Sequence, residues 1–187
     1  EGAIDCYNQA IRIKPDYAGA YNNMGNALSS KGDLEEAIES YKQALRIKPD
    51  FAGAYNNMAN AMKNKGDLAE AIESCKQALK IKPDYADAYY NMANAMKDKG
   101  DLAEAIDSYK QALKIKPNYA SAYYNMGNAL NEKGNPEVAI DSFKQAIKIK
   151  PDYALAYNNM GNALSSKGDL EGAIDCYNQA IRIKPDY

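Results

Sequence analysis

Six of the seven prolines in this chain recur every 34 residues, and this spacing limits the fold more than any other feature of the sequence. The segments that carry them align without insertion or deletion. A constant period of this length is typical of arrays of helical units, in which each unit contacts mainly its neighbours. The periodic prolines are Pro15, Pro49, Pro83, Pro117, Pro151 and Pro185. We therefore divide the chain into a half repeat, 1–17, and five full repeats, 18–51, 52–85, 86–119, 120–153 and 154–187, which form a single array.

Each full repeat is expected to hold two helices. In the first repeat Tyr21, Met24 and Leu28 lie three and four residues apart, a spacing typical of one face of a helix. Gly32 follows this helix, and glycine there favours the left-handed backbone that ends a helix. Asp33 is expected to cap the second helix, with Glu36 completing a capping box. Asp67–Glu70 and Asp101–Glu104 repeat the pattern.

The second helix of each repeat is expected to bury one face and to end before the periodic proline, since the residue before a proline is disfavoured in helical geometry. In the fourth repeat Asn135 is the expected cap, and Pro136 is tolerated at the first helical position. The inward residues of the first repeat are expected to be Leu34, Ala37, Ile38, Tyr41, Ala44, Leu45 and Ile47.

Two positions are expected to set how closely the two helices of a repeat approach each other. One position holds only small residues, Gly25, Ala59, Ala93, Gly127 and Gly161. The other holds an aromatic ring in four repeats, Tyr41, Tyr109, Phe143 and Tyr177, and Cys75 in the second repeat. Ala93→Leu is expected to cost about 1–3 kcal/mol through overpacking. The smaller Cys75 predicts a locally less stable second repeat.

Composition argues against several classes of function. The chain holds 23 basic and 25 acidic residues, a balance that is unlike the strongly basic surfaces that bind nucleic acid. No apolar run is long enough to span a membrane. Histidine is absent, so metal and general-base sites lack their commonest residue, and we expect no metal and no cofactor. Three scattered cysteines do not make a disulfide framework and favour a reducing compartment, the cytoplasm.

The carboxylates argue against an enzyme. Glu39, Glu73, Asp107 and Asp141 occupy one exposed position of successive second helices. Catalysis needs one asymmetric site with a nucleophile, a base and a pocket, and residues repeated by symmetry do not supply it. We therefore expect no catalytic residues in this chain.

The repeat resembles the tetratricopeptide repeat, a 34-residue helix–turn–helix motif. The residues that match the landmarks of that motif are Tyr21, Met24, Gly25, Leu28, Ala37, Tyr41, Ala44 and Pro49. The resemblance covers the whole chain, with Tyr in place of the usual Trp as a mild departure. It implies an all-α, right-handed solenoid of antiparallel helix pairs, in which the first helices line a concave groove.

Two positions on the first helix hold asparagine in every repeat. Asparagine forms helices less readily than Glu, Lys or Ala, so its recurrence on a surface calls for a reason. Stacked repeats would align the amides into two rows that can bind the backbone of an extended peptide. Alternatively, the amides bond neighbouring helices and hold the array together. The first row is Asn23, Asn57, Asn91, Asn125 and Asn159, and the second is Asn26, Asn60, Asn94, Asn128 and Asn162.

The asparagine rows also resemble those of the repeat domain of O-linked N-acetylglucosamine transferases, where an asparagine ladder grips substrate backbones. The Asn23 row aligns with that ladder. Beside it, Tyr90 and Tyr124 could form an aromatic shelf that adds to a peptide site, or could make only local contacts. Domains of this family that clamp the C-terminal carboxylate of chaperones use lysine and arginine at the corresponding positions. Here those positions hold Asn or Tyr, so we expect no such partner.

These features favour a protein-interaction scaffold that binds extended peptides, with a client that the sequence does not identify. One alternative is the substrate-recognition arm of a larger enzyme, such as a glycosyltransferase. Another is a self-associating structural array. Residues 1–17 and 171–187 are identical, so the ends of the chain could exchange a helix between copies. Such head-to-tail contacts propagate unless a rotation closes them.

Overall fold

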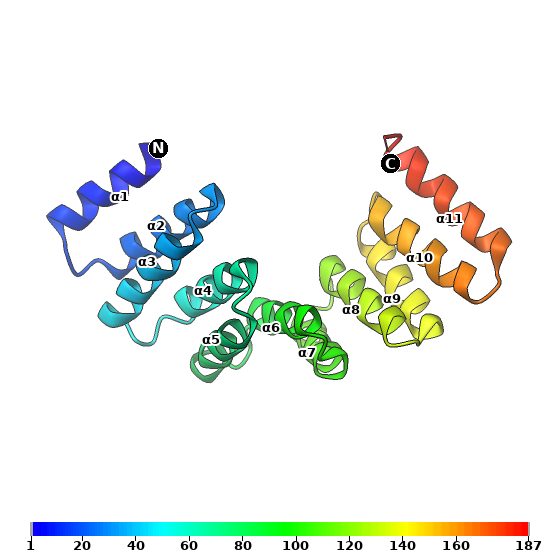
Figure 1. The fold of residues 1–187 in the computed structure, drawn as a ribbon, viewed down its shortest axis with the longest axis horizontal. Coiled ribbons are helices and arrows are strands. Elements are labelled where there is room, and N and C mark those ends of the chain that lie inside the picture. The colour runs from blue at the N-terminus through cyan, green and yellow to red at the C-terminus, as the bar shows by residue number, and fades with distance from the viewer. Residues whose placement is uncertain (1, 187) are drawn as a thin grey trace. The chain divides into compact units, whose positions relative to one another are not determined.

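The computed structural model describes residues 2–186, and over this range the chain is an all-α solenoid of helical hairpins without β-strands (Figure 1). The first helices of the repeats are α2 (Ala18–Lys31), α4 (Ala52–Lys65), α6 (Ala86–Lys99), α8 (Ala120–Glu132) and α10 (Ala154–Ser166). The second helices are α1 (Gly2–Ile13), α3 (Leu34–Ile47), α5 (Leu68–Ile81), α7 (Leu102–Ile115), α9 (Pro136–Ile149) and α11 (Leu170–Ile183).

By their internal contacts the repeats form two compact units, one ending at Ala95 and the other starting at Met96, so the boundary falls within α6. In the first unit α2 packs on α3 and α4 on α5, and α3 also contacts α4. In the second unit α8 packs on α9 and α10 on α11, and α9 also contacts α10. In the first unit α3 and α4, and in the second unit α9 and α10, are therefore each held by the helix before and the helix after, as expected for stacked repeats.

The turn between the two helices of each repeat contains the predicted glycine. Gly32 has φ of 95°, in the left-handed region, and equivalent glycines close every later repeat in the same way. The Asp33 N–H donates to the Leu28 carbonyl at 3.0 Å and the Gly32 N–H to the Ser29 carbonyl at 3.2 Å. These two bonds satisfy carbonyl groups that the end of the helix leaves open.

The predicted capping boxes are wrong in three repeats. The side chains of Asp33, Asp67 and Asp101 stand at the start of the second helix but accept no capping hydrogen bond. Each carboxylate is instead bound by the lysine two residues earlier, as in the 2.7 Å contact from Lys31 to Asp33.

In the last repeat the equivalent lysine has a different partner. Lys167 reaches Glu137 of the preceding repeat at 3.2 Å. Asp169 is then left to accept the Gly172 N–H at 3.0 Å, as a capping residue should. In the fourth repeat Asn135 and Pro136 stand at the predicted N-cap and first helical positions, but the Asn135 side chain accepts no capping hydrogen bond.

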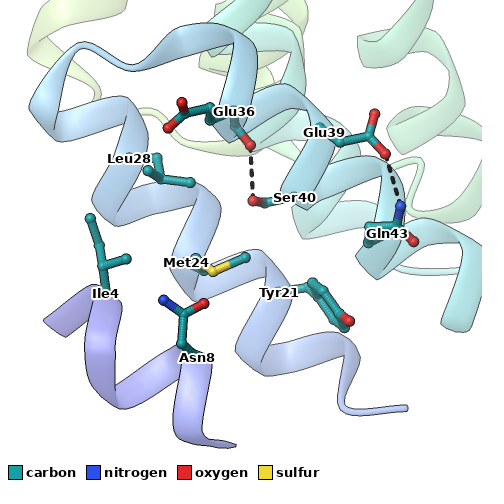
Figure 2. Close-up of a pocket in the computed structure, with 9 residues that line it drawn as sticks. All are labelled: Ile4, Asn8, Tyr21, Met24, Leu28, Glu36, Glu39, Ser40 and Gln43. Carbon is teal, nitrogen blue, oxygen red and sulfur yellow. Dashed lines mark hydrogen bonds between the residues drawn. The ribbon is translucent and has the colours of Figure 1, made fainter. Parts of the chain in front are cut away.

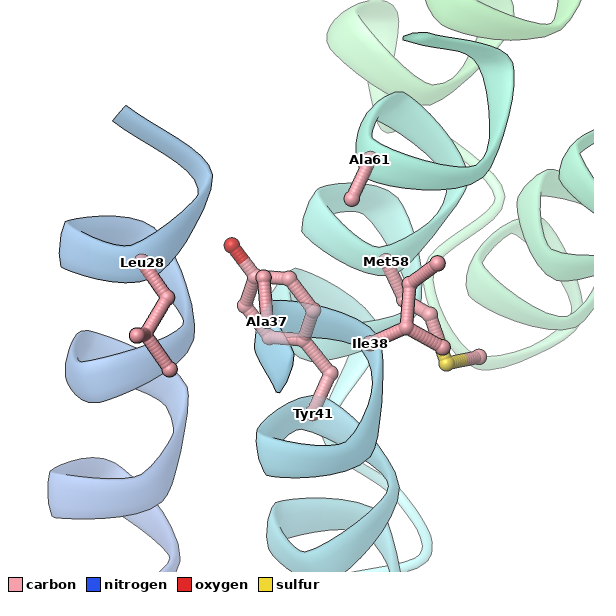
Figure 3. Packing of buried hydrophobic residues seen from close by; sticks show 6 residues of the cluster. All are labelled: Leu28, Ala37, Ile38, Tyr41, Met58 and Ala61. Atoms are coloured by element: carbon pink, nitrogen blue, oxygen red, sulfur yellow. The ribbon is translucent and has the colours of Figure 1, made fainter. Parts of the chain in front are cut away.

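The cores of the first, third and fourth repeats consist of alanines around one large aromatic side chain, and Figure 3 shows the packing around Tyr41 of the first repeat. Ala37 and Ala44 are fully buried beside Tyr41 in α3. Tyr109, Phe143 and Cys75 are likewise fully buried in their repeats. Ile38 lies on the next side of α3, in one cluster with Met58 and Ala61 of α4. The inward face is therefore as predicted except at Ile47, which is 38% exposed at the end of the helix.

The column of small residues is explained by the aromatic column. A Cβ atom at Gly25 would lie 2.6 Å from the ring of Tyr41, closer than two carbon atoms can approach. At Gly127 it would lie 2.6 Å from the ring of Phe143. The predicted close contact between the helices of a repeat is thus present in both units.

A cation–π contact recurs in the turns between repeats. After α1, α3, α5, α7 and α9 a lysine lies over the aromatic ring three residues later, as Lys48 lies over Phe51 at 5.4 Å. The tightest of these contacts, Lys116 over Tyr119, measures 4.2 Å from Nζ to the ring centroid. Such a contact at an exposed site contributes about 0.5–1 kcal/mol and steadies the turn.

Candidate functional site

The first asparagine row forms a hydrogen-bonded ladder between successive first helices in each unit. In the first unit the Asn57 Nδ2 donates to the Asn22 Oδ1 at 3.1 Å, and the Asn91 Nδ2 donates to the Asn56 Oδ1 at 2.9 Å. Both acceptors are buried, with 8% and 7% of their surface exposed. A buried amide without a partner would cost about 1–3 kcal/mol, so each bond stabilises the stacking of two repeats.

The second unit uses tyrosine where the first uses asparagine. The Asn159 Nδ2 donates to the Tyr124 hydroxyl at 3.1 Å and to the Asn128 Oδ1 at 2.8 Å. Tyr124 is also packed against the rings of Phe143 and Tyr153, at 6.1 and 5.0 Å between ring centroids. Tyr124 therefore serves the packing of its own unit in addition to any role in binding. Tyr90 lies at the same position in the third repeat and is half-buried.

The residues directly before the first asparagine row also belong to the ladder, and the sequence did not predict this. The sequence assigns no role to Asn22 and Asn56, yet they accept the ladder bonds. Their signal in the sequence is the repeated pair of adjacent amides, Asn22–Asn23, Asn56–Asn57 and Asn158–Asn159. Within two of these pairs the first amide also donates to the second, at 3.3 Å for Asn22 and 3.2 Å for Asn158.

Two members of the second asparagine row, Asn26 and Asn162, are held by the core tyrosine of their own repeat. The Tyr41 hydroxyl donates to the Asn26 Oδ1 at 2.8 Å, and the Tyr177 hydroxyl donates to the Asn162 Oδ1 at 2.9 Å. Burial raises the pKa of Tyr41 to about 12, so this hydroxyl stays protonated and can donate at physiological pH. Asn26 and Asn162 are themselves exposed. Their Oδ1 atoms are thus held by a tyrosine of the same repeat, which leaves their Nδ2 groups to donate.

In the first unit the two rows meet at a polar pocket of about 350 Å³. Its lining holds no charged side chain. It consists of Asn26, Ser29, Ser30, Tyr41, Asn57 and Asn60. Three of the predicted site residues are therefore brought together around one pocket. Of the other predicted positions, Asn23 is exposed, and Asn94, Asn125 and Asn128 are half-buried.

The orientation of two amides gives the pocket both kinds of hydrogen-bonding group. Asn26 uses its Oδ1 for Tyr41, which leaves its Nδ2 to donate. Asn57 uses its Nδ2 for Asn22, which leaves its Oδ1 to accept. A peptide group has one donor and one acceptor, so it complements this pair.

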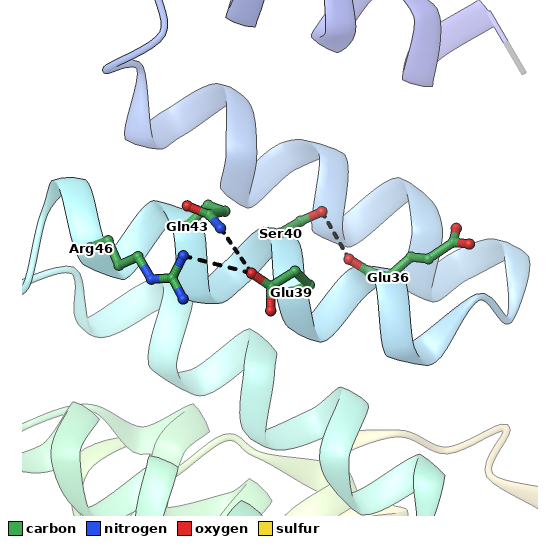
Figure 4. Close-up of polar contacts among 5 residues, drawn as sticks. All are labelled: Glu36, Glu39, Ser40, Gln43 and Arg46. Atoms are coloured by element: carbon green, nitrogen blue, oxygen red, sulfur yellow. Dashed lines mark hydrogen bonds and ion pairs between the residues drawn. The ribbon is translucent and has the colours of Figure 1, made fainter.

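The second helices present a different surface, shown for α3 in Figure 4. Glu39 accepts a hydrogen bond from Gln43 at 2.8 Å and lies 3.9 Å from Arg46 on an exposed face. The Ser40 hydroxyl donates to the backbone carbonyl of Glu36 at 2.9 Å. These are contacts within one helix, and they gather no reactive group opposite Glu39.

Metal-binding and membrane-spanning features were sought in residues 2–186. No group of three or more His, Cys, Asp or Glu side chains lies close enough together there to hold a metal ion. None of the helices in that range is both long and apolar enough to cross a membrane. The three cysteines carry unpaired thiols.

Comparison with known families finds the same motif along the chain. The model described as "TPR repeat" matches residues 1–32, 25–66, 63–100, 93–134 and 127–168. The model described as "Tetratricopeptide repeat" matches residues 154–187. No curated protein sequence matches the chain.

Solved structures with similar folds are numerous. A crystal structure of MamA is 28% identical with a TM-score of 0.80, and the alignment covers 87% of this chain and 95% of that one. YrrB, described as a TPR protein with an unusual peptide-binding site, is 26% identical with a TM-score of 0.75, over 97% of this chain and 93% of that one. MamA from Desulfovibrio magneticus RS-1 is 21% identical with a TM-score of 0.81, over 90% and 96%, and shows the fold alone.

Proposed function

Since the chain belongs to the tetratricopeptide repeat family, we propose that it is a protein-interaction scaffold whose asparagine rows bind extended peptide segments of a client. The half repeat and the five repeats act as a single array in this proposal. The similar YrrB structure is described as having a peptide-binding site, which supports the same class of partner here. The chain binds without catalysing, and its unpaired thiols favour the cytoplasm.

The observation that carries the proposal is the uncharged pocket lined by Asn26, Asn57 and Asn60. Asn26 offers a donor and Asn57 an acceptor, each held by an internal hydrogen bond, so a client peptide meets preorganised groups. Within each unit the equivalent amides of the other repeats act in the same way in this proposal, and aromatic surface is added by Tyr90 in the first unit and by Tyr124 in the second. A site of this kind recognises the peptide backbone and is indifferent to charge, which argues against a chaperone carboxylate.

The test separates backbone recognition from side-chain recognition. A peptide selected from a displayed library of random dodecapeptides is synthesised in two series, one with single alanine substitutions and one with single N-methylated amides. Fluorescence anisotropy should show that N-methylation at several positions weakens binding by about tenfold, the loss of one well-made hydrogen bond. Alanine substitutions should change the affinity much less. An affinity that depends on the side chains alone would contradict backbone recognition.

Matched variants of the chain locate the site. The double change Asn26→Ala with Asn60→Ala should weaken the selected peptide by about tenfold or more, since both residues line the pocket and both are exposed. The control is Glu39→Ala with Gln43→Ala on the exposed face of α3, which should leave the affinity unchanged (Figure 4). If the two double variants lost the same affinity for the peptide, the peptide would not bind at this pocket.

Self-association is a second candidate function, and the apolar face of α11 favours it. Leu170, Ile174 and Ile181 are 61%, 58% and 50% exposed on this helix. Exposed apolar side chains at helical spacing on one face mark a docking surface. A third reading, the substrate arm of a glycosyltransferase with an asparagine ladder, requires a catalytic part outside residues 1–187.

A further inference from the structure

The second asparagine row is bound differently from repeat to repeat, and the difference follows the residue in the core of the repeat. In the first repeat the Tyr41 hydroxyl donates to the Asn26 Oδ1 at 2.8 Å, and in the fifth the Tyr177 hydroxyl donates to the Asn162 Oδ1 at 2.9 Å. An amide whose oxygen is bound in this way presents its Nδ2 to a ligand, and that group only donates. A core tyrosine therefore makes the asparagine of its repeat a fixed donor.

The second and fourth repeats have no hydroxyl at this core position. The fourth repeat holds Phe143, and there the Asn128 Oδ1 accepts from the Asn159 Nδ2 of the next repeat at 2.8 Å instead. The second repeat holds Cys75, which is fully buried, and the Asn60 side chain makes no hydrogen bond in the described part of the chain. Asn60 is exposed, so its amide can turn to offer either its oxygen or its nitrogen.

A fixed and an unfixed asparagine lie at the same pocket. The polar pocket of about 350 Å³ in the first unit is lined by Asn26 of α2 and by Asn60 of α4. Tyr41, which fixes the first of these amides, also contributes to the lining. A peptide in this pocket therefore meets a donor of set direction on α2 and an amide of open direction on α4.

We propose that the core residue of a repeat decides how its second-row asparagine binds a client. Tyr41 makes Asn26 a fixed donor, whereas Cys75 leaves the amide of the second repeat free to turn. This inference rests on the proposed function, because it concerns the same pocket and the same peptide client. Over α2 the client has to present a backbone carbonyl, whereas over α4 it presents either a carbonyl or an N–H group.

Tyr41 is then a positioning residue, which acts on the client through Asn26. An amide that is already oriented does not have to be ordered when the client binds. Ordering one side chain on binding corresponds to about a twofold to tenfold difference in affinity. We therefore expect the Tyr41 hydroxyl to contribute a factor of this size.

The first test measures the motion of the asparagine side chains in the full chain without a client. Relaxation of the ¹⁵N nuclei in the side-chain amides should show a restricted Asn26 and a mobile Asn60. Tyr41→Phe should make both amides mobile and should still fold, because Phe143 occupies the equivalent position in the fourth repeat, also against a glycine. The matched control is Tyr21→Phe, which should change neither amide. Tyr21 lines a separate pocket between α1, α2 and α3 (Figure 2), and its hydroxyl makes no hydrogen bond among the described residues.

The reverse change is Cys75→Tyr, which should restrict the motion of Asn60. The third repeat combines Tyr109 with Ala93 at the core and small-residue positions, and the second repeat holds the equivalent Ala59. A tyrosine at the core position is therefore compatible with alanine at the small-residue position.

The second test measures the affinity of the selected dodecapeptide by fluorescence anisotropy. Tyr41→Phe should weaken binding by about twofold to tenfold, and it should have no further effect in a chain that already carries Asn26→Ala. A residue that only supports the fold would weaken binding equally in both backgrounds.

Three results would overturn this inference while leaving the proposed function intact. They are an Asn26 amide that stays restricted in Tyr41→Phe, an Asn60 amide that stays mobile in Cys75→Tyr, and an affinity that Tyr41→Phe leaves unchanged or lowers equally in both backgrounds. A peptide affinity that Asn26→Ala with Asn60→Ala leaves unaltered would overturn the proposed function and this inference together.

Discussion

At the scale of single residues, the glycines beside the core aromatics set the separation of the helices. Gly127 lies so close to Phe143 that an added Cβ would stand 2.6 Å from the ring. We expect Gly127→Leu to lower the free energy of unfolding by about 3 kcal/mol, because the ring is fully buried and has no room to move. Gly127→Ala should cost less, since the second and third repeats hold Ala59 and Ala93 at this position.

Urea denaturation followed by circular dichroism measures both changes. The control is Gly2→Ala, where an added Cβ meets nothing within 4 Å and helix propensity improves by up to about 1 kcal/mol. A Gly127→Leu variant as stable as the wild type would mean that α8 and α9 are not packed as closely as described.

Cys75 gives the chain a pH dependence in the alkaline range. Burial raises the pKa of this thiol from about 9 to about 12. A folded-state pKa above the unfolded value means that the stabilising contribution is complete below about pH 9 and is lost as the pH rises toward 12.

We therefore expect the wild type to lose more free energy of unfolding than Cys75→Ala between pH 8 and pH 10.5. Denaturation curves of both proteins at each pH give the difference, and the ionisation of Tyr41 cancels because both proteins contain it. Parallel losses in the two proteins would mean that Cys75 reaches solvent in the folded state.

At the scale of helices, the sequence predicted which segments form and where they end more accurately than how they are capped. The period of hydrophobic residues and the glycines at Gly32 and its equivalents located the helices, because these signals are local. The capping boxes failed since the choice of partner for Asp33 depends on a competing lysine, Lys31, whose reach is a matter of side-chain geometry. For the same reason the sequence did not predict which way each asparagine side-chain amide is oriented.

The ladder between first helices leads to a prediction at this scale. Asn56→Ala removes the acceptor of the Asn91 side chain from a position that is 7% exposed, and should destabilise the contact between α4 and α6 by about 1–3 kcal/mol. Hydrogen exchange should show weaker protection of the amides in α6. The exposed Asn60→Ala is the matched control and should change stability by less than about 0.5 kcal/mol.

Equal effects of the two substitutions would contradict a structural role for the ladder. The distinction matters for binding studies as well. Replacing the first asparagine row changes the stacking of the repeats. Replacing the exposed Asn60 changes the surface, whereas replacing Asn26 also removes the acceptor of the Tyr41 hydroxyl.

At the scale of the whole molecule, the 34-residue period was sufficient to predict an all-α solenoid of tetratricopeptide repeats, and the family matches cover the chain. The site was predictable only in outline. The sequence indicated which residues recur on one face, but Asn57 and Asn26 became an acceptor and a donor only through their bonds to Asn22 and Tyr41. The identity of the client depends on which amide donors and acceptors remain for binding, and a single sequence does not show which these are.

The central claim is that amides fixed by internal bonds bind the main chain of an extended peptide. A crystal structure of this chain with the selected dodecapeptide tests it most directly. The account predicts a peptide lying along the first helices, with its backbone carbonyl and N–H groups within hydrogen-bond distance of the Asn26, Asn57 and Asn60 side chains. A peptide lying on the second helices, or one held through its side chains without contact to these amides, would contradict it.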